Sequence, residues 1–516
     1  MPEWRRLSGA AWLALAAGLL GACPGDPAHP ATGHGVRAPA CLGVNIGQVG
    51  NRPSQSPFLD LVKQAPGWNL FEGGPPVPVD AQGWPTSIPP GARAGFAVNA
   101  PRRGRFVATF EGDGDIAVRS GGRLSRPSRG RVEVELDGGP AVFELVRTNP
   151  RDPLRSLSIV PAEFEHSHRE RVFDPDFLEL ARPFGVLRFH DWLRVVDSEL
   201  AHWRDRPKPD DFSQGTSKGA SVEYAIDLCN RLGADCWLNV PHMADDEYVE
   251  ELARLVRDRL RPSLRVYVEY SNEVWNYAHG DWCERAGEAL GMPREWDTRL
   301  RYQAHRSLEV FRIFERILGT GTGKGKGRLV RVLASQAVRH RAEVLVEWEG
   351  AYREADALAI APYFCEDAAR DLGASQIERL GPAGLADRCL EDVENLRGRV
   401  RALRALADRR GLSLVGYEGG QSLVASAALE DDATVQGVLD EANRLPQMGL
   451  AYGRLFRLWS EEGGSLLALY KLVYSPTKWG RWGLVETLSE PAGMAPKYRA
   501  ALEFIRNEPR QCTERH

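Results

Sequence analysis

Beyond its first 23 residues the sequence lacks any run of ~20 apolar residues, the length that a membrane-spanning helix needs. It also lacks long runs of one charge sign, and its 66 basic and 70 acidic side chains leave a net charge of −4. A nucleic-acid partner is therefore not expected, because such binding needs clustered positive charge. The eight cysteines include no Cys-x-x-Cys spacing that would fit a zinc site. We expect no metal and no organic cofactor.

The first 23 residues are typical of an export signal. Two arginines precede a short apolar stretch, and the tetrapeptide Leu20-Gly21-Ala22-Cys23 follows it. This tetrapeptide resembles a bacterial lipobox, so we expect Cys23 to carry lipid and to begin the mature chain. An ordinary secretory signal with a chance cysteine is the alternative. The prediction is an exported protein, lipid-anchored to the bacterial membrane at the cell surface or in the periplasm, with a flexible tether at 24–39.

Two patterns of apolar residues divide the rest of the chain. Between 94 and 165 apolar residues recur with period two, and strands are expected at 105–110, 116–119, 132–136 and 141–146. This stretch predicts a small all-β sandwich module. From 166 to 510 the pattern instead alternates between buried strand-like runs and helical stretches.

Eight strand-like runs lie outside the β module, at 42–46, 186–189, 236–240, 264–268, 329–333, 357–361, 412–415 and 466–470. Helices are expected at 175–184, 222–232, 246–260, 299–318, 342–348, 393–407 and 433–460. Eight such strands close a (β/α)₈ barrel. The predicted fold class is therefore α/β, a TIM barrel formed by 40–93 and 166–510, with the sandwich inserted after the first barrel strand. An open doubly wound sheet is the competing architecture.

Two glutamates follow strands of this predicted barrel. Glu273 comes after the fourth strand, preceded by Asn272, and Glu418 ends the seventh. Side chains at the carboxyl ends of barrel strands point into the top-face pocket, so the two carboxyl groups are expected to meet there. Such a pair hydrolyses glycosidic bonds: one group protonates the leaving oxygen, and the other attacks the sugar or activates water. The alternative is that Asn272-Glu273 caps a helix and Glu418 forms a structural ion pair.

An Asn-Glu after strand four and a Glu ending strand seven resemble the retaining glycoside hydrolases of clan A, over residues 40–490 without the insertion. The resemblance implies that Glu273 is the acid/base and Glu418 the nucleophile. It also implies that Arg188, on strand two, supports the nucleophile and that Tyr363, after strand six, hydrogen-bonds to it. Asn272 is expected to bind substrate. A plain salt bridge is the alternative for Arg188.

Four further residues near strand ends are candidates for substrate binding. His242 follows strand three and could bond a sugar hydroxyl, while Trp275 could line the pocket and raise the pKa of Glu273 by desolvation. Trp479 and Trp482 follow strand eight, and tryptophan faces stack on sugar rings. Ordinary packing is the alternative for each tryptophan, and an ordinary polar contact for the histidine.

The string from Ser271 to Asn276 also resembles bacterial exported proteins loosely labelled cellulose-binding, which implies carbohydrate contact. The sequence thus predicts a retaining glycoside hydrolase that acts on a polysaccharide or oligosaccharide by double displacement. Retention predicts carboxyl groups roughly 5–5.5 Å apart. The alternatives are a non-catalytic carbohydrate-binding surface lipoprotein and a scaffold without a sugar site. Cys365 with Cys389, and Cys229 with Cys236, could form disulfides, but the connectivity stays open.

Overall fold

The computed structural model describes residues 40–50, 55–128, 130–319 and 327–507. The predicted export signal, Cys23 and the tether at 24–39 lie outside these ranges. Eight parallel strands form a closed barrel, and the last strand pairs with the first. The predicted TIM barrel is therefore confirmed, and the open sheet is not the architecture. The strands are β1 (Cys41–Asn45), β10 (Val186–Arg188), β11 (Asp235–Val240), β12 (Val266–Tyr270), β13 (Leu329–Ala334), β14 (Ala357–Ile360), β16 (Ser413–Gly416) and β18 (Leu466–Leu469).

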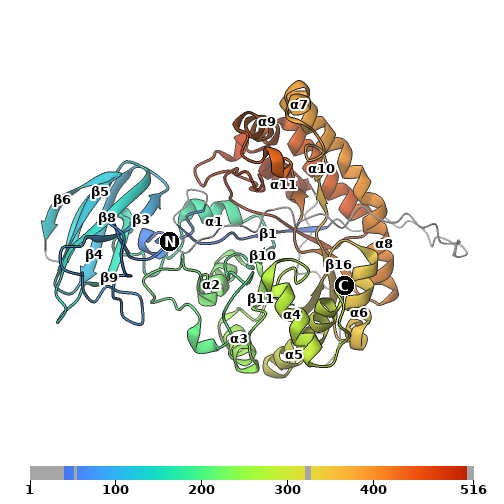
Figure 1. The fold of residues 1–516 in the computed structure, drawn as a ribbon, viewed down its shortest axis with the longest axis horizontal. Helices are drawn as coiled ribbons and strands as arrows, with labels where there is room; N and C mark the ends of the chain where they lie inside the picture. Colours follow the sequence, from blue (N-terminus) through green and yellow to red (C-terminus); the bar gives the residue numbers. More distant parts are fainter. Residues whose placement is uncertain (1–39, 51–54, 129, 320–326, 508–516) are drawn as a thin grey trace, which may run out of the picture.

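Helices surround this barrel (Figure 1). They are α1 (Pro175–Ala181), α2 (Val222–Leu232), α3 (Asp246–Arg259), α4 (Tyr277–Ala289), α5 (Thr298–Leu318), α6 (Arg339–Glu347), α7 (Ala374–Asp392), α8 (Leu396–Arg409), α9 (Ala433–Arg444), α10 (Pro446–Glu461) and α11 (Pro496–Asn507). In α3, the Asp245 side chain accepts a hydrogen bond from the Tyr248 amide, acidic residues fill the first turn, and arginines fill the last. None of the helices in the described ranges has the length and hydropathy of a membrane span.

The helix predicted at 433–460 is wrong in one respect, because the structure divides it into α9 and α10. Proline has no amide hydrogen to donate, and it disfavours a helical conformation in the residue before it. Leu445 is accordingly extended, with ψ 151°, and Pro446 begins the second helix. The pattern did not predict three of the helices, α4, α7 and α11.

The inserted module consists of two four-stranded antiparallel sheets, in the orders β2-β3-β8-β5 and β6-β7-β4-β9. The strands are β2 (Asn69–Leu70), β3 (Ala94–Ala100), β4 (Gly104–Glu111), β5 (Gly114–Ser120), β6 (Gly122–Ser128), β7 (Arg131–Leu136), β8 (Gly139–Thr148) and β9 (Arg155–Pro161). The predicted β sandwich is confirmed. In β7 the side chains of Val132, Val134 and Leu136 are buried while those between them are partly exposed, as the period of two predicts.

The module lies to one side of the barrel, next to the connection between β10 and α2 (Figure 1). Phe212 of this connection is buried in the module's core together with Phe96. Lys63 donates hydrogen bonds from Nζ to the carbonyl oxygens of Pro209 (2.8 Å) and Asp211 (2.7 Å). Because the connection leaves the carboxyl end of β10, the module lies beside the top face of the barrel. The boundary at residue 94 stays a prediction, since the same core also includes residues from 61–84.

One of the two suggested disulfides is present. Cys365 and Cys389 are bonded and enclose 24 positions of sequence, whereas Cys229 and Cys236 are buried free thiols. The suggested Cys229–Cys236 bridge is therefore wrong for this structure. The Cys365–Cys389 bridge ties the segment after β15 (Tyr363–Phe364) to α7.

Replacing both Cys365 and Cys389 with serine should lower the free energy of unfolding by about 3 kcal/mol, because the unfolded chain regains the entropy of a loop of this length. Denaturant unfolding under oxidising conditions measures the change. The control is the same comparison under reducing conditions, where the variant and the unchanged protein should unfold alike. Equal midpoints for the variant and the oxidised protein would contradict the bridge.

Candidate active site

Arg188, the last residue of β10, is fully buried at the carboxyl end of the barrel and joins several side chains of the site. Its Nη1 donates to Oε1 of Glu418 at 2.9 Å, and its Nη2 donates to Oδ1 of Asn272 at 2.8 Å. Its Nε and Nη2 also donate to the two carboxylate oxygens of Glu269, at 3.1 and 2.9 Å. The structure thus brings the predicted Arg188, Asn272 and Glu418 together. Such charge-assisted, bidentate contacts fix geometry as well as charge.

Glu418 lies two residues beyond β16 and is 5% exposed. While Oε1 faces Arg188, Oε2 accepts a hydrogen bond from the hydroxyl of Tyr363 at 2.9 Å. Nε2 of His190 lies 3.6 Å from Oε1. A cation on one oxygen and a hydroxyl donor on the other orient the carboxylate, and Tyr363 makes the contact that the resemblance implied.

Glu273 follows β12 and is 8% exposed. Its Oε1 accepts from the hydroxyl of Tyr417 at 2.7 Å, and its Oε2 accepts from Nδ2 of Asn276 at 3.0 Å. Burial and the charge of Glu418 raise the pKa of Glu273 to about 7, against the opposing effect of these two hydrogen bonds. Glu273 is therefore a carboxyl group that can hold a proton near neutral pH.

The backbone that carries Glu273 has an uncommon conformation. Ser271, Glu273 and Tyr277 all have positive φ values, of 59°, 44° and 60°. Non-glycine residues in this region cost about 1–3 kcal/mol each and cluster at functional sites. The turn after β12 therefore places the Glu273 side chain at an energetic cost that the surrounding packing offsets.

The other sequence candidates lie in different environments. His242 is buried beside His279 and Trp282, and its Nδ1 has no hydrogen-bond partner among the described residues. Burial and the charge of His279 lower the pKa of His242 to about 4, so the ring is neutral near pH 7. Trp275 is also buried, with its ring 6.5 Å from that of Tyr417.

The two tryptophans after β18 differ in exposure. Trp482 is half-buried, with its ring 5.6 Å from that of Tyr470. Trp479 is 51% exposed, and the Nζ of Lys478 lies 4.7 Å from its ring centre. Trp479 is thus available to a ligand, and Trp482 is mainly part of an aromatic cluster.

The sequence patterns missed the residues that surround Arg188 from the other strands. Glu269, 1% exposed, accepts from both Arg188 and the indole Nε1 of Trp237, the latter at 2.8 Å. Asn45 at the end of β1 accepts from Arg188 at 3.0 Å and donates to the carbonyl of Tyr417 at 2.9 Å. Glu269 could have been recognised from the sequence as a candidate, because it is a charged residue inside an otherwise apolar strand.

A second missed group lies next to Glu418. Asp191 accepts from Nζ of Lys471, the second residue after β18, and Nε2 of His190 is 3.3 Å from its Oδ1. Burial would raise the pKa of Asp191, but the charges of Lys471 and His190 hold it well below its usual value. No local sequence signal connects the two partners, because 280 positions separate them.

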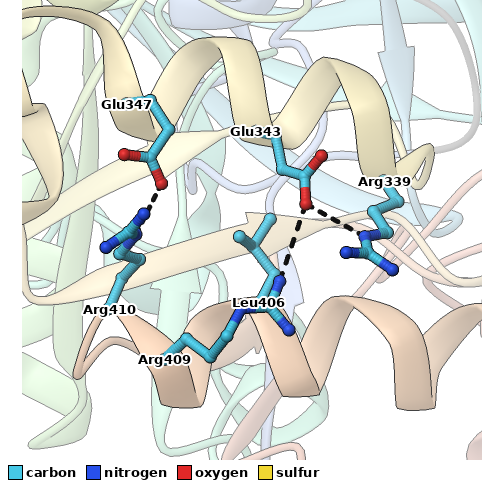
Figure 2. A pocket seen from close by; sticks show the side chains of 6 residues that line it. All are labelled: Arg339, Glu343, Glu347, Leu406, Arg409 and Arg410. Atoms are coloured by element: carbon cyan, nitrogen blue, oxygen red, sulfur yellow. Dashed lines mark hydrogen bonds and ion pairs between the residues drawn. The ribbon is translucent and has the colours of Figure 1, made fainter. Parts of the chain in front are cut away.

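A hollow of about 490 Å³ lies elsewhere, on the outside of the barrel between α6 and α8 (Figure 2). It is lined by Arg339, Glu343, Glu347, Leu406, Arg409 and Arg410. Its charged side chains are already matched in ion pairs on the surface, including Arg339 with Glu343 and Arg410 with Glu347. None of the candidate residues lines this hollow.

Comparison with known proteins gives structural neighbours only. No protein-family model matches the chain, and no curated protein sequence matches it. The GH51 arabinofuranosidase from Xanthomonas axonopodis pv. citri is 15% identical over 60% of this chain and 62% of its own, with a TM-score of 0.39. AbfB, a family 51 alpha-L-arabinofuranosidase from Bifidobacterium longum, is 12% identical over 65% and 68%, with a TM-score of 0.42.

A GH5-4 broad specificity endoglucanase from Clostridium acetobutylicum is 10% identical over 63% of this chain and 88% of its own, with a TM-score of 0.36. These neighbours are clan A glycoside hydrolases. The match spans less than two thirds of the Xanthomonas enzyme. All three identities are 15% or less and the TM-scores lie below 0.5, so these likenesses assign no function to the chain.

Proposed function

We propose that this protein is a retaining glycoside hydrolase that acts on a polysaccharide or oligosaccharide by double displacement. The observation that carries the proposal is the different environment of two carboxyl groups at one end of the barrel. Glu273 has a pKa raised to about 7, whereas Glu418 contacts the Arg188 guanidinium and the Tyr363 hydroxyl. A proton donor beside an oriented carboxylate is the arrangement that retaining hydrolysis uses.

In the first step Glu418 attacks the anomeric carbon, and the bond from this carbon to the leaving oxygen breaks. Glu273 gives its proton to that oxygen, so the products are a glycosyl ester on Glu418 and a free alcohol. In the second step the Glu273 carboxylate takes a proton from water. The water oxygen attacks the anomeric carbon, and the ester bond to Glu418 breaks.

The electrostatics of the pair support this change of role. The negative charge of Glu418 is one cause of the raised pKa of Glu273. Esterification of Glu418 removes that charge, and the pKa of Glu273 then falls. Glu273 is accordingly protonated and acts as an acid in the first step, and it is more fully ionised and acts as a base in the second.

Asn272, Tyr363 and Arg188 would hold the reacting groups. Asn272 accepts from Arg188 through Oδ1, which leaves its amide hydrogens to donate to a sugar hydroxyl. Tyr363 and Arg188 hold the Glu418 carboxylate before it attacks, and they bind it again after the glycosyl ester is hydrolysed. Trp479, His242 and Trp275 are proposed to contact substrate, and lipid attachment at Cys23 of an exported chain stays a prediction.

Purified protein should hydrolyse at least one member of a panel of aryl glycosides and plant and bacterial polysaccharides. The first product detected by NMR should have the anomeric configuration of the substrate, because two inversions restore it. A product of opposite configuration would contradict double displacement. Binding of oligosaccharides without turnover of any substrate would instead favour the carbohydrate-binding lipoprotein.

A further inference from the structure

A mostly buried ion pair, Asp191 with Lys471, lies near the proposed nucleophile but takes no part in the two steps above. Lys471 donates from Nζ to Oδ2 of Asp191, and the hydroxyl of Tyr470 donates to the same oxygen at 3.2 Å. The Nζ also lies 4.6 Å from the ring centre of Tyr470 and 4.8 Å from that of Tyr474. Asp191 follows β10 and Lys471 follows β18, so the ends of two barrel strands fix the position of the pair.

The pair is close to Glu418 and is partly open. Nε2 of His190 lies 3.3 Å from Asp191 and 3.6 Å from Glu418, so one imidazole nitrogen separates the two carboxylates. The Asp191 side chain keeps 21% of its surface exposed, whereas that of Lys471 keeps 7%. A sugar unit whose anomeric carbon meets Glu418 can therefore reach Asp191 with its other hydroxyl groups.

The charges around this position favour a neutral ligand. Three carboxylates, those of Glu269, Glu418 and Asp191, are close to two permanent cations, Arg188 and Lys471, and to the His190 ring between Glu418 and Asp191. Both cations already have carboxylate partners, so neither is free to bind another anion. A carboxylate on the substrate would add like charge to a partly desolvated site, which is unfavourable.

We propose that Asp191 and Lys471 select the sugar, by binding two adjacent hydroxyl groups of a neutral unit whose anomeric carbon faces Glu418. The Asp191 carboxylate accepts a hydrogen bond from one hydroxyl, and the Lys471 ammonium donates to the neighbouring one. Uronic acid units are disfavoured by the charge balance. This inference rests on the proposed function, because it assumes that the anomeric carbon is placed at Glu418.

The test compares neutral aryl glycosides with their 3-deoxy and 4-deoxy analogues and with aryl uronides. The unchanged protein should lose about 10- to 100-fold in kcat/KM on the deoxy analogue that lacks a bound hydroxyl, as hydrogen bonds to charged groups imply. Asp191→Asn and Lys471→Met should each lower kcat/KM on the parent substrate by a similar factor and lose most of this discrimination. Asp235→Asn is the matched control, a buried carboxylate paired with Arg265 at the opposite end of the barrel.

The outcomes separate the inference from the proposed function. Equal losses on parent and deoxy substrates, or preferred hydrolysis of uronides, would overturn the inference while leaving the hydrolase intact. If the unchanged protein hydrolyses nothing, the proposed function fails, and calorimetry with neutral and uronate oligosaccharides tests the site. Weaker binding of neutral sugars by Asp191→Asn then supports the inference, and equal binding by both proteins overturns it. Thermal unfolding of each variant checks that it is folded.

Discussion

Glu418→Gln should lower kcat by roughly 10⁴-fold or more, because the amide cannot form the glycosyl ester on which both steps depend. The substitution preserves size and the hydrogen bond from Tyr363, so oligosaccharides should still bind with nearly unchanged affinity. Initial rates on the preferred substrate and calorimetric binding to the variant measure the two quantities. The loss should appear in kcat rather than in KM.

Glu462→Gln is the matched control for this substitution. Glu462 is likewise mostly buried and paired with arginines, Arg397 and Arg401, at the end of α10. Its replacement should leave kcat close to that of the unchanged protein. A Glu418→Gln variant that kept even a tenth of the activity would remove Glu418 as the nucleophile.

The pH dependence of kcat/KM should have a descending limb set by Glu273. Burial and the Glu418 charge raise the pKa of this carboxyl to about 7, so the acid form persists up to about that pH and is lost above it. Activity on substrates with poor leaving groups should therefore fall about tenfold for each further pH unit. Rates from pH 5 to 9 measure the limb.

Glu273→Gln should lower kcat/KM on the same substrates by about 10²- to 10⁴-fold and abolish the limb. With an activated aryl glycoside, Glu273→Ala should form a glycosyl azide of retained configuration when azide is added, because azide needs no general base. An unchanged alkaline limb in the Gln variant would assign the titration to another group. An azide product of inverted configuration would show that the reaction does not pass through the Glu418 ester.

The barrel could be predicted because each of its strands is a short apolar run bounded by polar sequence. Of the three helices that were not predicted, α4 and α7 were missed for local reasons. α4 contains Gly280, a position that excludes a larger residue because an added Cβ would come within 2.2 Å of the Val274 carbonyl oxygen. α7 contains Gly381, with φ 64°, followed by Pro382. Glycine and proline weaken a helical pattern, and tertiary packing supplies the stability that propensity does not.

The site residues could be predicted where each directly follows a predicted strand. Pairs of residues from strands far apart in the sequence were harder to predict. Glu273 and Glu418 could be paired because strand order alone places them at one face. Arg188 and Tyr363 required the resemblance to a known family. Asp191 and its partner Lys471 could not be paired, because only the closure of the barrel brings the ends of its second and last strands, β10 and β18, close together.

The connection between β10 and α2 contacts both the candidate site of the barrel and the core of the sandwich. Asp191 near its start borders the nucleophile, whereas Phe212 farther along completes the aromatic core of the sandwich. Trimming the protein to its barrel would expose that phenylalanine to water and remove the packing that holds the segment leading back to Asp191. The sandwich therefore supports one wall of the candidate site, and the folding unit is the barrel together with the sandwich rather than the barrel alone.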